Sequence, residues 1–162
     1  MGDSWRGLAW RFGPPILWMA IISGFSTDSF SAEHTSRFLL PFLQWLLPGA
    51  TPATVDVVDT GIRKAAHLTE YGILALLWYR ALRRPEVAWQ TRVGLIAFVV
   101  ATAFAGLDEL HQMFVPSRGS SIADVGLDSL GAALALTASR VVQHFRGKWP
   151  AENRNQPGKE LP

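Results

Sequence analysis

The chain of 162 residues contains no cysteine. This absence excludes disulfide bonds, thiolate catalysis and cysteine-ligated metal sites. Charge is also scarce, because 17% of the residues are charged whereas 49% are hydrophobic. The charges gather at segment ends and leave residues 12–27, 93–107 and 129–139 without an Asp, Glu, Lys or Arg. Uncharged runs separated by charged connections favour an integral membrane protein.

We predict an all-α, polytopic membrane protein with a bundle of four transmembrane helices at residues 8–27, 62–79, 93–114 and 122–143. Some polar neighbours are included because a spanning helix needs roughly 20 residues. The alternative is a soluble helical bundle whose buried helices imitate spans. The stretch "RFLLPFLQWLLPG" at residues 37–49 is too short and too marked by proline to span, which indicates an interfacial or re-entrant helix in the first outer loop.

The basic residues set the expected orientation. Arginines lie at the beginning of the first predicted span and flank the connection between the second and third, and both arginines and lysines follow the fourth. Because these residues accumulate on the cytoplasmic side, we expect a multi-pass protein of the bacterial inner (cytoplasmic) membrane with both termini cytoplasmic. Residues 1–146 would form the transmembrane domain, and residues 147–162 a disordered cytoplasmic tail. The basic pI of about 9.4 then reflects contact with anionic lipid headgroups, and no nucleic-acid partner is expected.

Three of the predicted spans carry polar residues at helical spacing near their extracytoplasmic ends. Steps of three and four place such residues on one helix face. They are Lys64, His67 and Tyr71 on the second span, Asp108, Glu109 and Gln112 on the third, and Asp124 and Asp128 on the fourth. Ionisable groups at membrane depth are costly, face the bundle interior and mark function. We therefore predict a converging polar site at these helix ends.

The segments "RKAAHLTEYGILAL" and "DELHQMFVPSRGSSIADVGLDSLGA" resemble the VanZ-like family of small membrane proteins. The matching positions are Lys64, His67, Tyr71, Asp108, Glu109, Gln112, Phe114, Arg118, Asp124 and Gly131. Asp128 stands where the family usually has asparagine. The stretch "SGFSTDS" at residues 23–29 is similar to the end of the family's first helix. The resemblance implies a small helical membrane bundle and an association with glycopeptide (teicoplanin) resistance, but it implies no particular chemical activity.

Our leading hypothesis is a binding protein for an anionic lipid or cell-envelope precursor. In the turn at residues 116–121, an arginine can hold a phosphate bidentately, while hydroxyls and backbone N–H groups at the following helix start add donors. The predicted ligand-binding residues are Lys64, Tyr71, Asp108, Gln112, Arg118, Ser120, Ser121 and Asp128. The expected partners are membrane lipids and either a lipid-linked cell-wall precursor or the glycopeptide itself.

Two alternatives stay open. An intramembrane hydrolase or transferase could use His67, Glu109 and Asp124 as general acid and base groups or as ligands of a divalent cation. A structural or scaffold protein could instead use the same residues to lock its helices together through ion pairs and hydrogen bonds. In that case His67 is an ordinary interior histidine, and the serine preceding the fourth span is a helix N-cap.

Overall fold

The computed structural model describes residues 5–27, 32–84, 89–115 and 121–148. These ranges contain five helices and no strand, which confirms the predicted all-α class. The helices are α1 (Trp5–Phe25), α2 (Ala32–Leu46), α3 (Pro52–Leu82), α4 (Thr91–Gln112) and α5 (Ile122–Lys148). Four of them overlap the predicted spans. The remaining helix, α2, overlaps the segment in which an additional outer helix was predicted.

The boundaries of α3 follow from local chemistry. Thr51 caps its beginning, since the hydroxyl accepts a hydrogen bond from the backbone N–H of Thr54 at 3.3 Å, and Pro52 occupies the first turn, where no N–H partner is needed. The helix ends before Arg83, which is extended and lies two residues before a proline. The predicted span began ten residues later, at Ile62, because the first turns of α3 are too polar to register as an apolar run.

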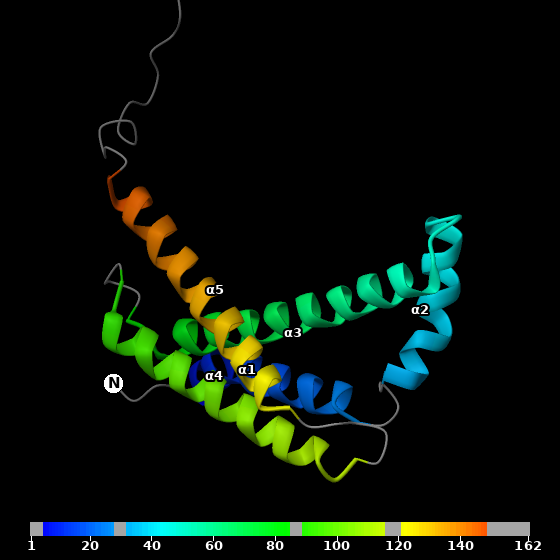
Figure 1. Cartoon of the computed structure of the whole chain (residues 1–162). Coiled ribbons are helices and arrows are strands. Elements are labelled where there is room, and N and C mark those ends of the chain that lie inside the picture. Colours follow the sequence, from blue (N-terminus) through cyan, green and yellow to red (C-terminus); the bar gives the residue numbers. More distant parts are fainter. Residues whose placement is uncertain (1–4, 28–31, 85–88, 116–120, 149–162) are drawn as a thin grey trace, which may run out of the picture.

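Helix α5 is also longer than its predicted span and continues to Lys148. It therefore passes the predicted start of the cytoplasmic tail by two residues, and residues 149–162 lie outside the described part of the chain. The additional residues include His144 and Phe145, and the end of α5 extends away from the other helices (Figure 1).

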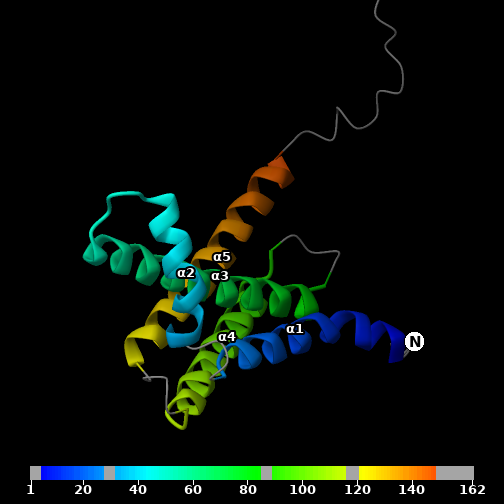
Figure 2. The ribbon, with the colours of Figure 1, turned by 90° about the vertical axis from the view of Figure 1, so that its right-hand side faces the viewer.

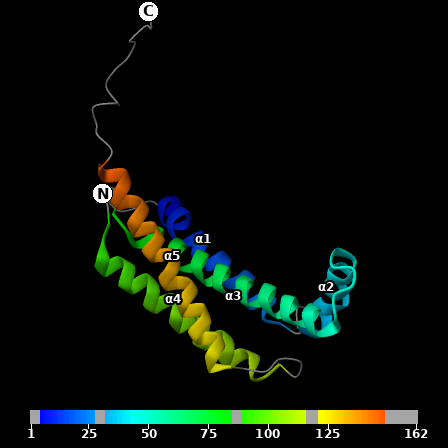
Figure 3. The same ribbon diagram turned by 45° about the horizontal axis from the view of Figure 1, so that its top comes forward.

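Helix α3 is the centre of the arrangement, because it packs against each of the other helices. Helix α1 runs beside it in the opposite direction, while α4 and α5 form the other side of the molecule (Figures 1 and 3). Helix α2 lies at one end, beside the beginning of α3 (Figure 1). Figure 2 shows the end of α1 approaching the end of α4. The bundle therefore gathers the ends of α1 and α4 and the beginning of α5 in one region.

Two glycines permit the close crossing of α3 and α5. A Cβ atom added at Gly72 would lie 3.3 Å from both the carbonyl oxygen of Gly131 and Cβ of Ala135. A Cβ atom added at Gly131 would lie 2.8 Å from Cα of Leu68. Small residues at such crossings allow two backbones to touch, which is a common way to join helices that share no apolar driving force in lipid.

The interior is filled by aromatic and small side chains. Tyr71 and Leu74 of α3 are buried against Ile22 of α1, and alanines at steps of four line the inner face of α4: Ala97, Ala101 and Ala105. At the start of α1, the guanidinium of Arg11 donates from Nε and an Nη to the carbonyl oxygen of Ala81 at 3.1 and 2.9 Å. This contact ties the beginning of α1 to the last turn of α3.

Helix α4 and the segment Ile122–Phe145 of α5 are long and apolar enough to cross a membrane. Only 33% and 22% of their most apolar windows are buried within the protein. The core helix of a soluble protein would bury its apolar residues, whereas large apolar side chains on these helices point outward, among them Leu95, Val99, Leu107, Leu134 and Val141. Both helices therefore have the surface expected of lipid-exposed segments.

Candidate functional site

A buried group of three polar side chains joins the end of α1 to α4. The hydroxyl of Ser26, just beyond the end of α1, donates to Oδ2 of Asp108 at 2.7 Å. The side-chain amide of Gln112 donates to the same oxygen at 2.8 Å and lies 3.4 Å from the hydroxyl of Ser26. All three side chains are buried, at 4–5% exposure. The amide of Gln112 can reach this oxygen of Asp108 because the two residues are one helical turn apart on α4.

A second contact joins α3 to α5. Nδ1 of His67 lies 3.2 Å from Oδ1 of Asp128. The carboxylate is almost completely buried, with 1% of its side chain exposed, whereas the histidine retains 28% exposure. A carboxylate accepts from Nδ1–H and thereby leaves Nε2 as the imidazole nitrogen with a free lone pair. The pair thus holds a half-exposed histidine in a defined orientation.

A third contact joins the end of α4 to the start of α5. Oε2 of Glu109 accepts a hydrogen bond from the backbone N–H of Ser121 at 2.7 Å. The hydroxyl of Ser121 in turn accepts from the backbone N–H of Ala123 at 3.2 Å, so this serine caps the beginning of α5. A carboxylate near a helix N-terminus is also favoured by the helix dipole.

These contacts, together with Asp124, whose charge acts on Glu109 and Asp128, define one region. We call it the polar cluster: Ser26, His67, Asp108, Glu109, Gln112, Ser121, Asp124 and Asp128. The charges of its four acidic residues act on one another. Of the basic residues near them on α3, His67 is bonded to Asp128, Lys64 is exposed, and Arg63 pairs with Asp59 at 3.1 Å. Within the described residues, the cluster therefore holds more negative than positive charge, which suits a positively charged group from elsewhere.

The structure brings most of the predicted site residues together, although in different settings. Asp108, Gln112, Glu109, Ser121, His67 and Asp128 make the hydrogen bonds described above. Tyr71 is buried between the helices, and its hydroxyl has no hydrogen-bond partner within the described part of the chain. Asp124 lies half-buried in the first turn of α5, and Lys64 faces outward. Arg118 and Ser120 lie outside the described residues.

Ser26 was not among the predicted site residues. The sequence offered one signal for it, the similarity of residues 23–29 to the end of the family's first helix. A single serine after an apolar helix has no charged residue three or four positions away on that helix that would mark a shared face. Its hydrogen bond to Asp108 connects residues 82 positions apart in the sequence. Only the packing of α1 against the bundle makes this contact visible.

The divalent-cation alternative needs several oxygen or imidazole ligands directed at one point. Across the ranges that the structure describes, no group of three or more His, Asp or Glu residues is arranged to hold a metal ion. His67 and Asp128 face each other instead, and Glu109 faces a backbone N–H. The described residues therefore fit hydrogen bonding better than metal ligation.

The sequence matches the model of the VanZ/LLP1 family over residues 14–143. The chain belongs to the VanZ/LLP1 family. This match includes the whole polar cluster and every predicted site residue. No curated protein and no solved structure matches the chain. Family membership and the two apolar helices together indicate a membrane protein.

Proposed function

We propose that this VanZ/LLP1-family chain crosses the bacterial inner membrane four times, through α1, α3, α4 and α5, with both termini cytoplasmic. The alternating direction of these helices supports the proposal, since Arg11 at the start of α1 contacts the end of α3 while Ser26 beyond the end of α1 contacts the end of α4. Helix α2 would lie at the outer interface, because Phe42 and Trp45 are more than half exposed while Leu43 is buried.

The absence of cysteine makes a direct topology test possible. A single cysteine replaces exposed Asp56, at the start of α3, or exposed Arg92, at the start of α4. A membrane-impermeant thiol reagent should label the Asp56→Cys protein from outside intact spheroplasts and the Arg92→Cys protein only after lysis. Labelling of both positions from the same side would exclude the proposed arrangement. The unsubstituted chain is the matched control.

The polar cluster, we further propose, binds the head group of a phosphate-bearing lipid or of a lipid-linked cell-wall precursor at the outer leaflet. The observation that carries this proposal is the convergence of side chains from α1, α3, α4 and α5 at one end of the bundle. A purely structural network would satisfy all its members, but one oxygen of Asp108 and the hydroxyl of Tyr71 are buried without a partner among the residues that the structure describes.

The charges favour a ligand that carries both signs. The buried carboxylates suit an ammonium group, whereas exposed Lys64 and Arg118, which lies outside the described residues, suit a phosphate. Wall precursors and aminophospholipids contain both groups. If the ligand is a wall precursor, its sequestration would lower sensitivity to teicoplanin, which acts on that class of molecule.

Native mass spectrometry of the purified protein tests the binding. Wild type should retain a phosphate-bearing lipid or precursor, and the double variant Lys64→Gln, Arg118→Gln should lose it. The double variant Arg84→Gln, Arg92→Gln, at the opposite end of the bundle, removes the same number of positive charges from exposed positions and is the matched control. Equal retention by all three proteins would refute the proposed head-group site. Teicoplanin sensitivity of cells carrying the same variants tests the link to resistance.

A second function is favoured by the orientation of His67. With Nδ1 held by Asp128, Nε2 is free to accept a proton, which is the arrangement of a general base. A hydrolase or transferase would use this nitrogen together with Glu109 and Asp124. Incubation with a lipid-linked precursor should then yield a product with wild type and none with His67→Gln, while binding persists in both. The enzymatic proposal fails if wild type binds the precursor and leaves it chemically unchanged.

A further inference from the structure

The opposite end of the bundle has a groove between the start of α4 and the end of α5. One part has a volume of about 760 Å³ and is lined by the polar side chains of Thr91, Arg140 and His144 and by apolar ones that include Trp89, Val141 and Phe145. A second cavity of about 290 Å³ shares Trp89, Thr91 and Arg140 and continues between the two helices. Its additional lining is apolar: Leu95, Phe98, Ala133 and Leu136. We call the two together the α4/α5 groove.

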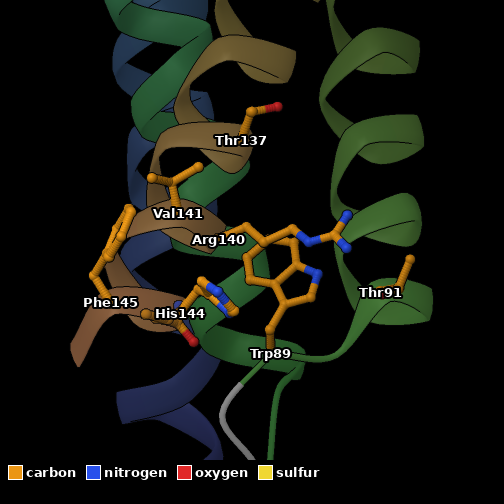
Figure 4. A pocket seen from close by; sticks show the side chains of 8 residues that line it. Trp89, Thr91, Thr137, Arg140, Val141, His144 and Phe145 are labelled. Carbon is orange, nitrogen blue, oxygen red and sulfur yellow. The ribbon is translucent and has the colours of Figure 1, made fainter. Parts of the chain in front are cut away.

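A guanidinium is the cationic group of this groove. Figure 4 shows the side chain of Arg140 reaching from α5 toward α4, beside the indole of Trp89. Arg140 is exposed, and within the described residues it makes no hydrogen bond or ion pair. A guanidinium without a carboxylate partner is ready to bind a phosphate bidentately.

The wall formed by Trp89 is held in place. Its indole stacks on Tyr79 with ring centroids 4.4 Å apart, and a Cβ atom added at Gly94 would lie 2.8 Å from the indole. The hydroxyl of Tyr79 also accepts a hydrogen bond from the backbone N–H of Gln90 at 3.1 Å. A tryptophan fixed at the end of an apolar helix is typical of the membrane interface.

Along α4, the lining of the groove changes from Thr91 at the helix start to Leu95 and Phe98 in the direction of the membrane interior. Thr91 and Phe98 are seven residues apart, which is about 10 Å along a helix, or about a third of the roughly 30 Å hydrocarbon core. A phospholipid has the same order of groups, with a phosphate at the interface and acyl chains pointing inward. Basic pockets between transmembrane helices bind the head groups of anionic lipids in this way.

We infer that the α4/α5 groove is a binding site for one anionic phospholipid, whose phosphate contacts Arg140 and whose acyl chain lies against Leu95 and Phe98. The inference requires that α4 and α5 be embedded in a bilayer, but it does not depend on the ligand of the polar cluster. In the proposed topology the lipid belongs to the cytoplasmic leaflet, so this site and the polar cluster face opposite leaflets.

Native mass spectrometry after reconstitution into bilayers of equal parts phosphatidylglycerol and phosphatidylcholine tests the inference. Wild type should retain one phosphatidylglycerol in preference to phosphatidylcholine. Arg140→Gln should reduce that preference at least about tenfold, which corresponds to about 1.4 kcal/mol. Arg80→Gln is the matched control, since Arg80 is an exposed arginine of the last turn of α3 that does not line the groove.

A second variant tests the apolar part without changing charge. Ala133→Phe would fill the space beside Leu136 and should also lower phosphatidylglycerol retention, with helical content and micellar size showing that the protein is folded. Equal losses in the Arg140 and Arg80 variants would mean unspecific charge attraction, and equal retention of both lipids would mean unspecific apolar contact. Either result overturns the inference, as does displacement of the lipid by inorganic phosphate at equal concentration.

Discussion

Replacement of Gly131 by alanine tests the claim that backbone contact between α3 and α5 holds the polar cluster together. The added Cβ would lie 2.8 Å from Cα of Leu68 and closer still to the carbonyl oxygen of that residue. Both are backbone atoms of a helix, so neither can rotate away. Overpacking costs about 1–3 kcal/mol, and the rigid partners place this substitution at the upper end of that range.

The gain in helix propensity opposes this cost. Alanine is favoured over glycine within a helix by about 1 kcal/mol, so the net loss of unfolding free energy at Gly131 should be about 2 kcal/mol. Gly126 is the matched control on the same helix, because a Cβ atom there would meet nothing within 4 Å. Gly126→Ala should therefore be neutral or stabilise by up to about 1 kcal/mol.

Unfolding in mixed detergent and dodecyl sulfate micelles, followed by helical circular dichroism, measures both free energies. The Gly131→Ala protein should also show a weakened contact between His67 and Asp128, because His67 precedes Leu68 and Asp128 lies one turn before Gly131. Nitrogen NMR of labelled histidine reports that contact. If the two alanine variants unfold within about 0.5 kcal/mol of each other, well inside the expected difference, the crossing is not as tight as argued.

The same unfolding assay checks three further substitutions. Ser26→Ala removes a donor from the buried carboxylate of Asp108 and should cost about 1–3 kcal/mol, so an unchanged stability would show that the carboxylate does not need this donor. Tyr71→Phe should change stability by less than about 0.5 kcal/mol, since no described residue is a hydrogen-bond partner of the hydroxyl, and a larger loss would reveal an unrecognised acceptor. Trp18→Phe breaks the 2.9 Å bond from the indole N–H to the carbonyl oxygen of Glu70 and should cost about 1 kcal/mol, and a result near zero would mean that water replaces the bond.

The sequence predicted the helix boundaries well where the apolar run and the helix cover the same residues. The apolar run at residues 93–107 has charged or polar residues on both sides, and the predicted span at residues 93–114 differs from α4 by two residues at each end. Helix α3 shows the limit of this reasoning. Its first turns contain Asp56, Asp59 and Thr60, so helical backbone continues where the apolar signal has stopped. Helix formation needs backbone hydrogen bonds and a cap, not lipid-compatible side chains.

The candidate site divides in the same way. Helical spacing predicted which residues share a face, and Asp108 with Gln112 forms the hydrogen bond expected from a separation of four. Spacing cannot predict which partner lies on another helix, because that depends on how the helices pack. The pairing of His67 with Asp128 and of Asp108 with Ser26 therefore required the structure. The α4/α5 groove was also hidden, since it depends on how far α5 extends past the bundle.

The pairing of His67 with Asp128 gives a physical reason for the residue that departs from the family pattern. An asparagine at position 128 could accept the same hydrogen bond through its amide oxygen and would bury no charge. An aspartate with 1% of its side chain exposed is costly unless a positive group compensates it, and the group in contact with it is His67. With a protonated imidazole, His67 and Asp128 would form an ion pair with no net charge. With an uncharged imidazole, the carboxylate of Asp128 would contribute a further negative charge beside Asp108, Glu109 and Asp124. The aspartate therefore makes the charge of the polar cluster depend on His67, and with it the attraction of the cluster for a cationic head group.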